Sequence, residues 1–189
     1  MALAGLAALS PLLLLTAACV ILGSGRPALF RQTRVGRLGR PFTMYKFRTM
    51  RSDPSGPAVT AGDDPRITRI GALLRRTKLD ELPELWNVVR GDMSLVGPRP
   101  EAPRYVDAGE KRWERVLSVR PGITDPTTLN LIDEESLLAS VGGDREQYYR
   151  EHLVPKKLDG YIAYLERRSW RSDVDVLLRT VRSLMLRKP

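Results

Sequence analysis

The sequence has one cysteine and one histidine in 189 residues. Cys19 alone cannot form an intrachain disulfide, and one cysteine with one histidine supplies too few ligands for a Cys/His zinc site. A Ser-His-Asp triad would depend on His152 alone, so acid–base and nucleophilic chemistry falls to carboxylates. Aromatic residues make up 6% of the chain and are scattered, which excludes a platform for stacking bases, and we expect no nucleic-acid partner.

Phosphate-binding glycine motifs are also missing: the sequence contains neither a P-loop nor a G-x-G-x-x-G run. The net charge is nevertheless +9, carried mostly by arginine. By itself, such an excess indicates an anionic partner: nucleic acid, a phospholipid surface or a phosphorylated substrate. The length suits one domain with a hydrophobic core.

One long apolar run opens the chain, over residues 3–22. Its length matches a bilayer-spanning helix, which takes about 20 residues. A cleaved signal peptide is disfavoured because no lysine or arginine precedes the run, although Leu15–Cys19 loosely resembles a lipoprotein cleavage box. Two interpretations stay open: a spanning helix, and a helix broken at Ser10-Pro11 that re-enters on the same side.

Five arginines follow the apolar run between residues 26 and 40. By the positive-inside tendency this flank, and the domain after it, are cytoplasmic. We therefore expect a membrane helix and linker over residues 1–25 and a cytoplasmic domain over residues 26–189. The domain is expected to be α/β, mainly α, with a small β-hairpin around residues 28–50 and helices at residues 66–76, 79–89, 112–119, 155–168 and 173–187.

The stretch 79–89 is the central element. Its apolar residues recur at helical spacing and predict one buried face, with Asp80 as N-cap and Gly91 as the helix stop. Asp80 and Glu81 would then lie at a helix N-terminus, where the dipole favours an ionised carboxylate near phosphate and a cation. A plain helix start explains the same pair equally simply.

Cations accompany this stretch on both sides. Lys46 and Arg48 would share one face of a strand, Arg75 ends a predicted helix, and Arg99 lies between two prolines that fix its backbone. A pinned arginine suits anion binding because its fork is held in place before the ligand arrives.

Five runs, taken together and in order, resemble one family. They are residues 45–50 (YKFRTM), 67–71 (ITRIG), 79–88 (LDELPELWNV), 91–100 (GDMSLVGPRP) and 120–124 (RPGIT). The chain resembles the bacterial sugar transferases, the small monotopic phosphoglycosyl transferases, over nearly its whole length.

The resemblance implies a function. Family members move a sugar 1-phosphate from a UDP-sugar to polyprenyl phosphate, at the cytoplasmic face of the bacterial inner membrane, in surface glycan synthesis. It implies a monotopic protein with a re-entrant helix broken at Ser10-Pro11. It also implies that Asp80 is the nucleophile of a covalent aspartyl intermediate, with Glu81 as its catalytic partner and Mg²⁺ held by both. The expected substrate-binding residues are Lys46, Arg48, Arg75, Arg99 and Arg120.

Two features depart from the family pattern. Members usually carry basic residues and a Phe-Asp pair before the membrane helix, so we expect a shortened N-terminus here. A glycine commonly follows the Pro-Gly-Ile-Thr run, where this chain has Asp125. Two other functions stay open on sequence alone: a catalytically idle, membrane-anchored adaptor, and an exported lipoprotein modified at Cys19. The sugar, the pathway and the oligomeric state are not specified by the sequence.

Overall fold

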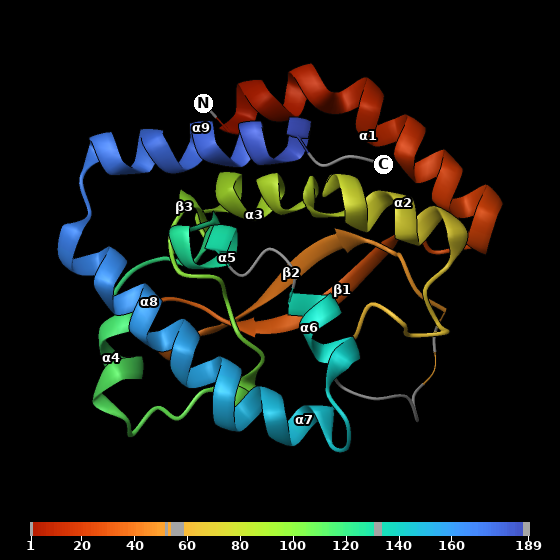
Figure 1. Cartoon of the computed structure of the whole chain (residues 1–189). Helices are drawn as coiled ribbons and strands as arrows, with labels where there is room; N and C mark the ends of the chain where they lie inside the picture. Colours follow the sequence, from red (N-terminus) through yellow and green to blue (C-terminus); the bar gives the residue numbers. More distant parts are fainter. Residues whose placement is uncertain (1, 52, 54–58, 131–133, 187–189) are drawn as a thin grey trace.

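A computed structural model describes residues 2–51, 53, 59–130 and 134–186. Its helices are α1 (Ala2–Ser24), α2 (Arg69–Thr77), α3 (Glu84–Arg90), α4 (Lys111–Leu117), α5 (Pro126–Asn130), α6 (Glu134–Ser140), α7 (Arg145–Tyr148), α8 (Val154–Arg167) and α9 (Trp170–Leu186). Its strands are β1 (Leu29–Val35), β2 (Pro41–Phe47), β3 (Ser94–Val96) and β4 (Gly122–Thr124). The structure is therefore mainly helical with small sheets, as predicted (Figure 1).

The predicted hairpin is confirmed. Strands β1 and β2 pair antiparallel from Leu29–Phe47 to Val35–Pro41, and a short 3₁₀ turn, Arg37–Gly39, lies between them. A second pair, β3 with β4, runs parallel and was not predicted. This pair needs glycine at Gly122, because a Cβ there would lie 2.1 Å from the Gly97 amide nitrogen.

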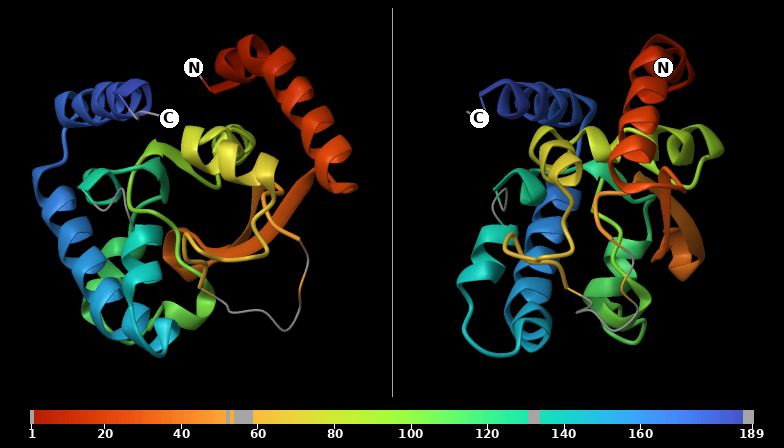
Figure 2. Two further views of the ribbon diagram at one scale, coloured as in Figure 1. Left: turned by 45° about the vertical axis from the view of Figure 1, so that its right-hand side comes forward. Right: turned by 90° about the vertical axis from the view of Figure 1, so that its right-hand side faces the viewer.

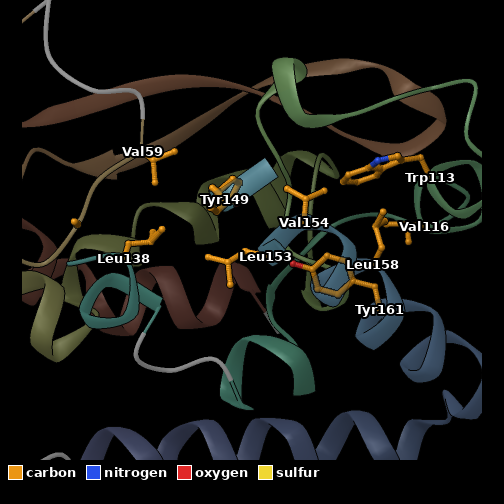
Figure 3. Close-up of a cluster of buried hydrophobic side chains, with 10 residues drawn as sticks. Val59, Trp113, Val116, Leu138, Tyr149, Leu153, Val154, Leu158 and Tyr161 are labelled. Carbon is orange, nitrogen blue, oxygen red and sulfur yellow. The ribbon is translucent and has the colours of Figure 1, made fainter. Parts of the chain in front are cut away.

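The main core lies between α8, α4, α6 and the segment around Val59. It contains Val59, Ala61, Trp113, Val116, Leu138, Tyr149, Leu153, Val154, Leu158 and Tyr161 (Figure 3). Helix α8 supplies the centre of this cluster because its residues at i, i+4 and i+7 (Val154, Leu158, Tyr161) share one face. The expected helix over residues 155–168 is thus confirmed.

Helix α1 lies outside this core. It is helical throughout Ala2–Ser24 with Pro11 inside, so the break predicted at Ser10-Pro11 is not an interruption of the helix. Its axis bends part-way along its length (Figure 1 and Figure 2), and a proline within a helix favours a bend because it lacks an N–H group. Within the described residues, α1 is the helix long and apolar enough to cross a membrane.

Asp125, the departure from the family pattern, has a structural explanation. Its side chain is fully buried and caps α5, accepting hydrogen bonds from the backbone N–H groups of Thr127 at 2.7 Å and Thr128 at 3.0 Å. Burial raises the pKa of this carboxyl group.

Candidate active site

The stretch predicted as one helix is divided. Leu79–Glu81 forms a 3₁₀ turn after Lys78, and the α-helix begins only at Glu84. Asp80 is therefore not the N-cap of α3, and the prediction that a helix dipole acts on it there is wrong. Gly91 does end the helix as predicted, with a φ of 82° in the left-handed region.

Helix α3 also differs from the prediction, because its most buried residues include polar ones. Glu84 and Asn87 are buried, whereas Trp86 is 48% exposed and Val89 36% exposed. The Asn87 amide donates to the carbonyl of Thr43 at 2.7 Å and accepts from the N–H of Tyr45 at 3.2 Å. The polar face of α3 thus packs on β2, because the side-chain amide of Asn87 forms hydrogen bonds with backbone groups of that strand.

Glu81 is held by cations from three segments. Its Oε1 lies 2.9 Å from Nζ of Lys46 on β2 and 3.8 Å from Nζ of Lys78. The guanidinium of Arg99 donates to the same carboxylate. Burial favours a raised pKa for Glu81, but the charges of Arg99 and Lys46 outweigh it and hold the pKa well below its ordinary value.

A third carboxylate, Glu84, was not predicted as part of the site. Its Oε1 lies 3.3 Å from Nζ of Lys46, and its side chain is 1% exposed. Burial raises the pKa of Glu84 against the effect of Lys46. The signal was present in the sequence: Asp80, Glu84 and Asn87 are spaced four and three apart, which puts polar groups on one helical face.

Asp80 itself is buried, and this burial raises its pKa, with the neighbouring charge of Glu81 acting in the same direction. Lys46, Lys78 and Arg75 oppose the shift. Oδ1 of Asp80 has no hydrogen-bond partner among the described residues. A buried carboxylate with one oxygen that lacks a hydrogen-bond partner is suited either to attack an electrophile or to bind a cation.

Mg²⁺ fits Asp80 better than it fits Glu81. The ion prefers oxygen ligands and usually keeps water and substrate phosphate in its shell, so one carboxylate is sufficient. The carboxylate of Glu81 is already engaged by Lys46 and Arg99. Across the described part of the chain, no group of three or more His, Cys, Asp or Glu residues could hold a metal. Mg²⁺ binding at Asp80 and Glu81 stays a prediction.

These groups line a cavity of about 480 Å³. Asp80, Glu81, Lys46, Arg75 and Arg99 are all on its wall, so the structure brings these predicted residues together. Its volume lies in the range of small-molecule sites, roughly 300–1,000 Å³. Cations dominate the wall near Asp80, which suits a ligand with several negative charges.

The other predicted cations are placed differently. Arg48 is on the cavity wall, but its terminal N–H groups donate to carbonyl oxygens of residues 24–26. Arg75 donates to Glu135 at 2.7 Å. Arg120 is exposed and is not among the residues that line this cavity, so its role in substrate binding stays a prediction. A Cβ on Gly91 would lie 3.9 Å from its guanidinium, which puts that group beside the C-terminal end of α3.

The segment carrying Arg99 is fixed by a buried network that sequence reasoning missed. The Glu101 carboxylate accepts hydrogen bonds from Tyr149 at 2.8 Å and from Lys157 at 3.1 Å. Arg34 donates to the carbonyl of Pro100 at 3.2 Å. Burial would raise the pKa of Glu101, but Lys157 and Arg34 lower it below its ordinary value. Lys157 lies 56 positions from Glu101, and no local pattern links them.

The sequence matches a known family of proteins. The family model described as bacterial sugar transferase matches residues 1–187. The chain belongs to the bacterial sugar transferase family. It is 43% identical over 182 residues to a UDP-glucose:undecaprenyl-phosphate glucose-1-phosphate transferase of Caulobacter vibrioides, covering 93% of this chain and 63% of that protein.

Two further relatives of this chain have similar names. A transferase of Escherichia coli, also named UDP-glucose:undecaprenyl-phosphate glucose-1-phosphate transferase, is 35% identical over 92% of this chain and 36% of its own length. A putative undecaprenyl-phosphate N-acetylgalactosaminyl 1-phosphate transferase of Bacillus subtilis is 47% identical over 56% of this chain and 60% of its own length. The chain thus spans less than two thirds of each of these relatives.

Arg99 and Arg120 offer a matched test of the cavity. We expect Arg99→Lys to lower turnover about 10- to 100-fold, because lysine keeps a charge beside Glu81 but loses the planar fork. Arg120→Lys should stay near wild type, since its side chain is exposed outside the cavity. Turnover of both variants is measured, and circular dichroism checks that both are folded. Equal losses of turnover in the two variants would contradict the assignment of Arg99 to the site.

Proposed function

We propose that this chain transfers a sugar 1-phosphate from a UDP-sugar to polyprenyl phosphate, giving polyprenyl diphosphate sugar and UMP. The observation that carries the proposal is Asp80, a buried carboxylate on the wall of a cation-lined cavity, whose Oδ1 has no hydrogen-bond partner among the described residues. The names of the relatives support the two substrates, UDP-sugar and undecaprenyl phosphate. The step would begin the assembly of a surface glycan.

The proposed chemistry has two displacements. An oxygen of Asp80 forms a bond to the β-phosphorus while the bond to the bridging oxygen breaks, and UMP leaves with that electron pair. A phosphate oxygen of the acceptor then attacks the phosphorus of this phosphosugar–aspartyl anhydride, and the bond between phosphorus and the Asp80 oxygen breaks, which releases the carboxylate. Lys46 and Arg99 stabilise the charge that develops on the phosphoryl oxygens. Mg²⁺, when bound, would supply further charge neutralisation there.

We infer a positioning role for Glu81. Its pKa is held well below the ordinary value by Arg99 and Lys46, so it is ionised and a weak base near neutral pH. We infer that Glu81 orders the two cations beside Asp80 rather than taking a proton from the acceptor.

The outer surface supports association with a membrane. Helices α1, α3 and α9 lie on the same side of the molecule (Figure 1 and Figure 2). Their exposed apolar side chains include Leu14, Leu15, Leu22, Trp86, Val89, Trp170, Val174, Leu178, Val181 and Met185. A basic amphipathic helix such as α9 suits an anionic bilayer surface. We propose that α1 re-enters the cytoplasmic face of the inner membrane and that residues 26–189 form the catalytic domain.

The proposal is tested by release of UMP. The protein is placed in nanodiscs with Mg²⁺, undecaprenyl phosphate and a panel of UDP-sugars. Release with one sugar, dependent on acceptor and abolished by chelator, is the expected result. No UMP release with any UDP-sugar, together with salt-dependent nucleic-acid binding, would favour the membrane-anchored adaptor. Lipid attached to Cys19 would favour an exported lipoprotein.

A further inference from the structure

We propose that Arg48 is a positioning residue that fastens the C-terminal end of α1 to strand β2, so that the apolar helix and Lys46 are positioned together. The inference rests on the proposed function, in which Lys46 stabilises phosphoryl charge. It assigns Arg48 to the joint between α1 and the domain instead of to the substrate.

The first argument is the set of contacts that Arg48 makes. Its Nη2 donates to the carbonyl of Ser24 at 2.6 Å and to the carbonyl of Gly25, and its Nη1 donates to the carbonyl of Arg26 at 3.0 Å. The last turn of α1 contains no basic residue of its own. The carbonyl groups at a helix C-terminus lack partners within the helix and carry partial negative charge. Arg48 supplies both the donors and the positive charge that this end needs.

The second argument is what the two preceding residues do. Lys46 contacts Glu81 and Glu84 at 2.9 and 3.3 Å. Phe47 is 4% exposed and packs in one cluster with Val20 of α1 and Leu74 of α2. Three consecutive residues therefore link the acidic site, the side of α1 and the end of α1.

The third argument is the stiffness of this connection. Lys46 and Arg48 are separated by one residue, and backbone pairing of β2 with β1 reaches Phe47. A displacement of the end of α1 would move Arg48 and, through about 7 Å of extended chain, Lys46. Because misplacement of a positioned group by about 1 Å can cost up to about 100-fold in rate, this coupling has a measurable consequence.

The experiment compares Arg48→Gln and Arg48→Lys with Arg40→Gln, an exposed arginine in the turn between β1 and β2. Each variant is held in nanodiscs of phosphatidylethanolamine and phosphatidylglycerol. Steady-state kinetics use the UDP-sugar that the wild type accepts. Pulsed electron paramagnetic resonance reports the distance between spin labels at Cys19, the native cysteine on α1, and at Lys111→Cys on α4.

We expect Arg48→Gln to lower kcat about 10- to 100-fold with KM for the UDP-sugar nearly unchanged, and to broaden the distance distribution. Arg48→Lys should show a smaller loss of kcat and a narrower distance distribution than Arg48→Gln, because lysine keeps a positive charge and a hydrogen-bond donor. Arg40→Gln should match the wild type in both measurements.

Two results would overturn the inference. A raised KM with an unchanged distance distribution would show that Arg48 contacts the substrate instead. A broadened distribution with wild-type kcat would show that α1 and Lys46 are not coupled. If the wild type releases no UMP with any sugar, the proposed function fails separately, and an unbroadened distribution in Arg48→Gln would still refute the fastening of α1.

Discussion

Asp80→Asn is expected to abolish transfer, lowering UMP release at least about 1,000-fold. The amide keeps the shape of the carboxylate but lacks the charged oxygen that attacks phosphorus. The measurement is UMP release under saturating UDP-sugar and undecaprenyl phosphate. Asp175→Asn, which neutralises an exposed carboxylate on α9, is the matched control and should retain wild-type turnover.

The stability of Asp80→Asn should not fall. Burial raises the pKa of Asp80 in the folded protein above its unfolded value, so the ionised form is less stable when folded than when exposed. This acid therefore opposes folding once the pH rises above the unfolded pKa, and a neutral amide removes that cost. We expect a thermal midpoint equal to or above that of the wild type. A midpoint several degrees lower would contradict the argument that burial of the Asp80 charge opposes folding. Turnover above about 1% of the wild-type value would contradict the assignment of Asp80 as nucleophile.

Gly71→Ala is expected to destabilise the protein by about 3 kcal/mol or more. A Cβ at this position would lie 1.9 Å from the carbonyl oxygen of Thr49, which is backbone and cannot rotate away. The same oxygen accepts hydrogen bonds from the N–H and the hydroxyl of Thr68, the N-cap of α2. The start of α2 must therefore separate from the segment that follows β2.

The control is Gly142→Ala, because nothing lies within 4 Å of a Cβ built at Gly142. Thermal unfolding of detergent-solubilised protein, followed by near-ultraviolet circular dichroism, should show a midpoint about 6–12 °C lower for Gly71→Ala. Gly142→Ala should move it by no more than about 2 °C. Similar midpoints for the two variants would show that α2 adjusts freely against Thr49.

The sequence was sufficient for elements whose signals are local. The hairpin follows from two extended runs around a glycine turn, and α2 and α8 follow from apolar spacing with Thr68 and Pro155 near their starts. The parallel pair β3–β4 could not be foreseen in this way. Its strands are three residues long and are joined by a close backbone contact at Gly97 and Gly122, which leaves no periodic pattern.

The site was predictable as a set of residues but not as an arrangement. Asp80, Glu81, Lys46 and Arg99 do meet around one cavity. Arg120 has the same chemistry, and only the chain path shows that it lies elsewhere. The buried side of α3 was predicted only in part: the whole apolar stripe was expected to be buried, whereas Trp86 and Val89 are exposed and the polar Glu84 and Asn87 are buried. Periodicity locates a stripe but does not tell which medium it contacts.

The exposed apolar side chains of α3 have a consequence for handling the protein. Trp86 and Val89 would each be hydrated in plain buffer, while Glu84 and Asn87 stay inside. The exposed apolar side chains of this helix stabilise the fold only when lipid or detergent covers them. The free energy of unfolding therefore depends on the lipid or detergent in which it is measured. Solubility engineering guided by hydropathy should therefore change Trp86 and Val89 and leave untouched the two polar residues that conventional patterning would place outside.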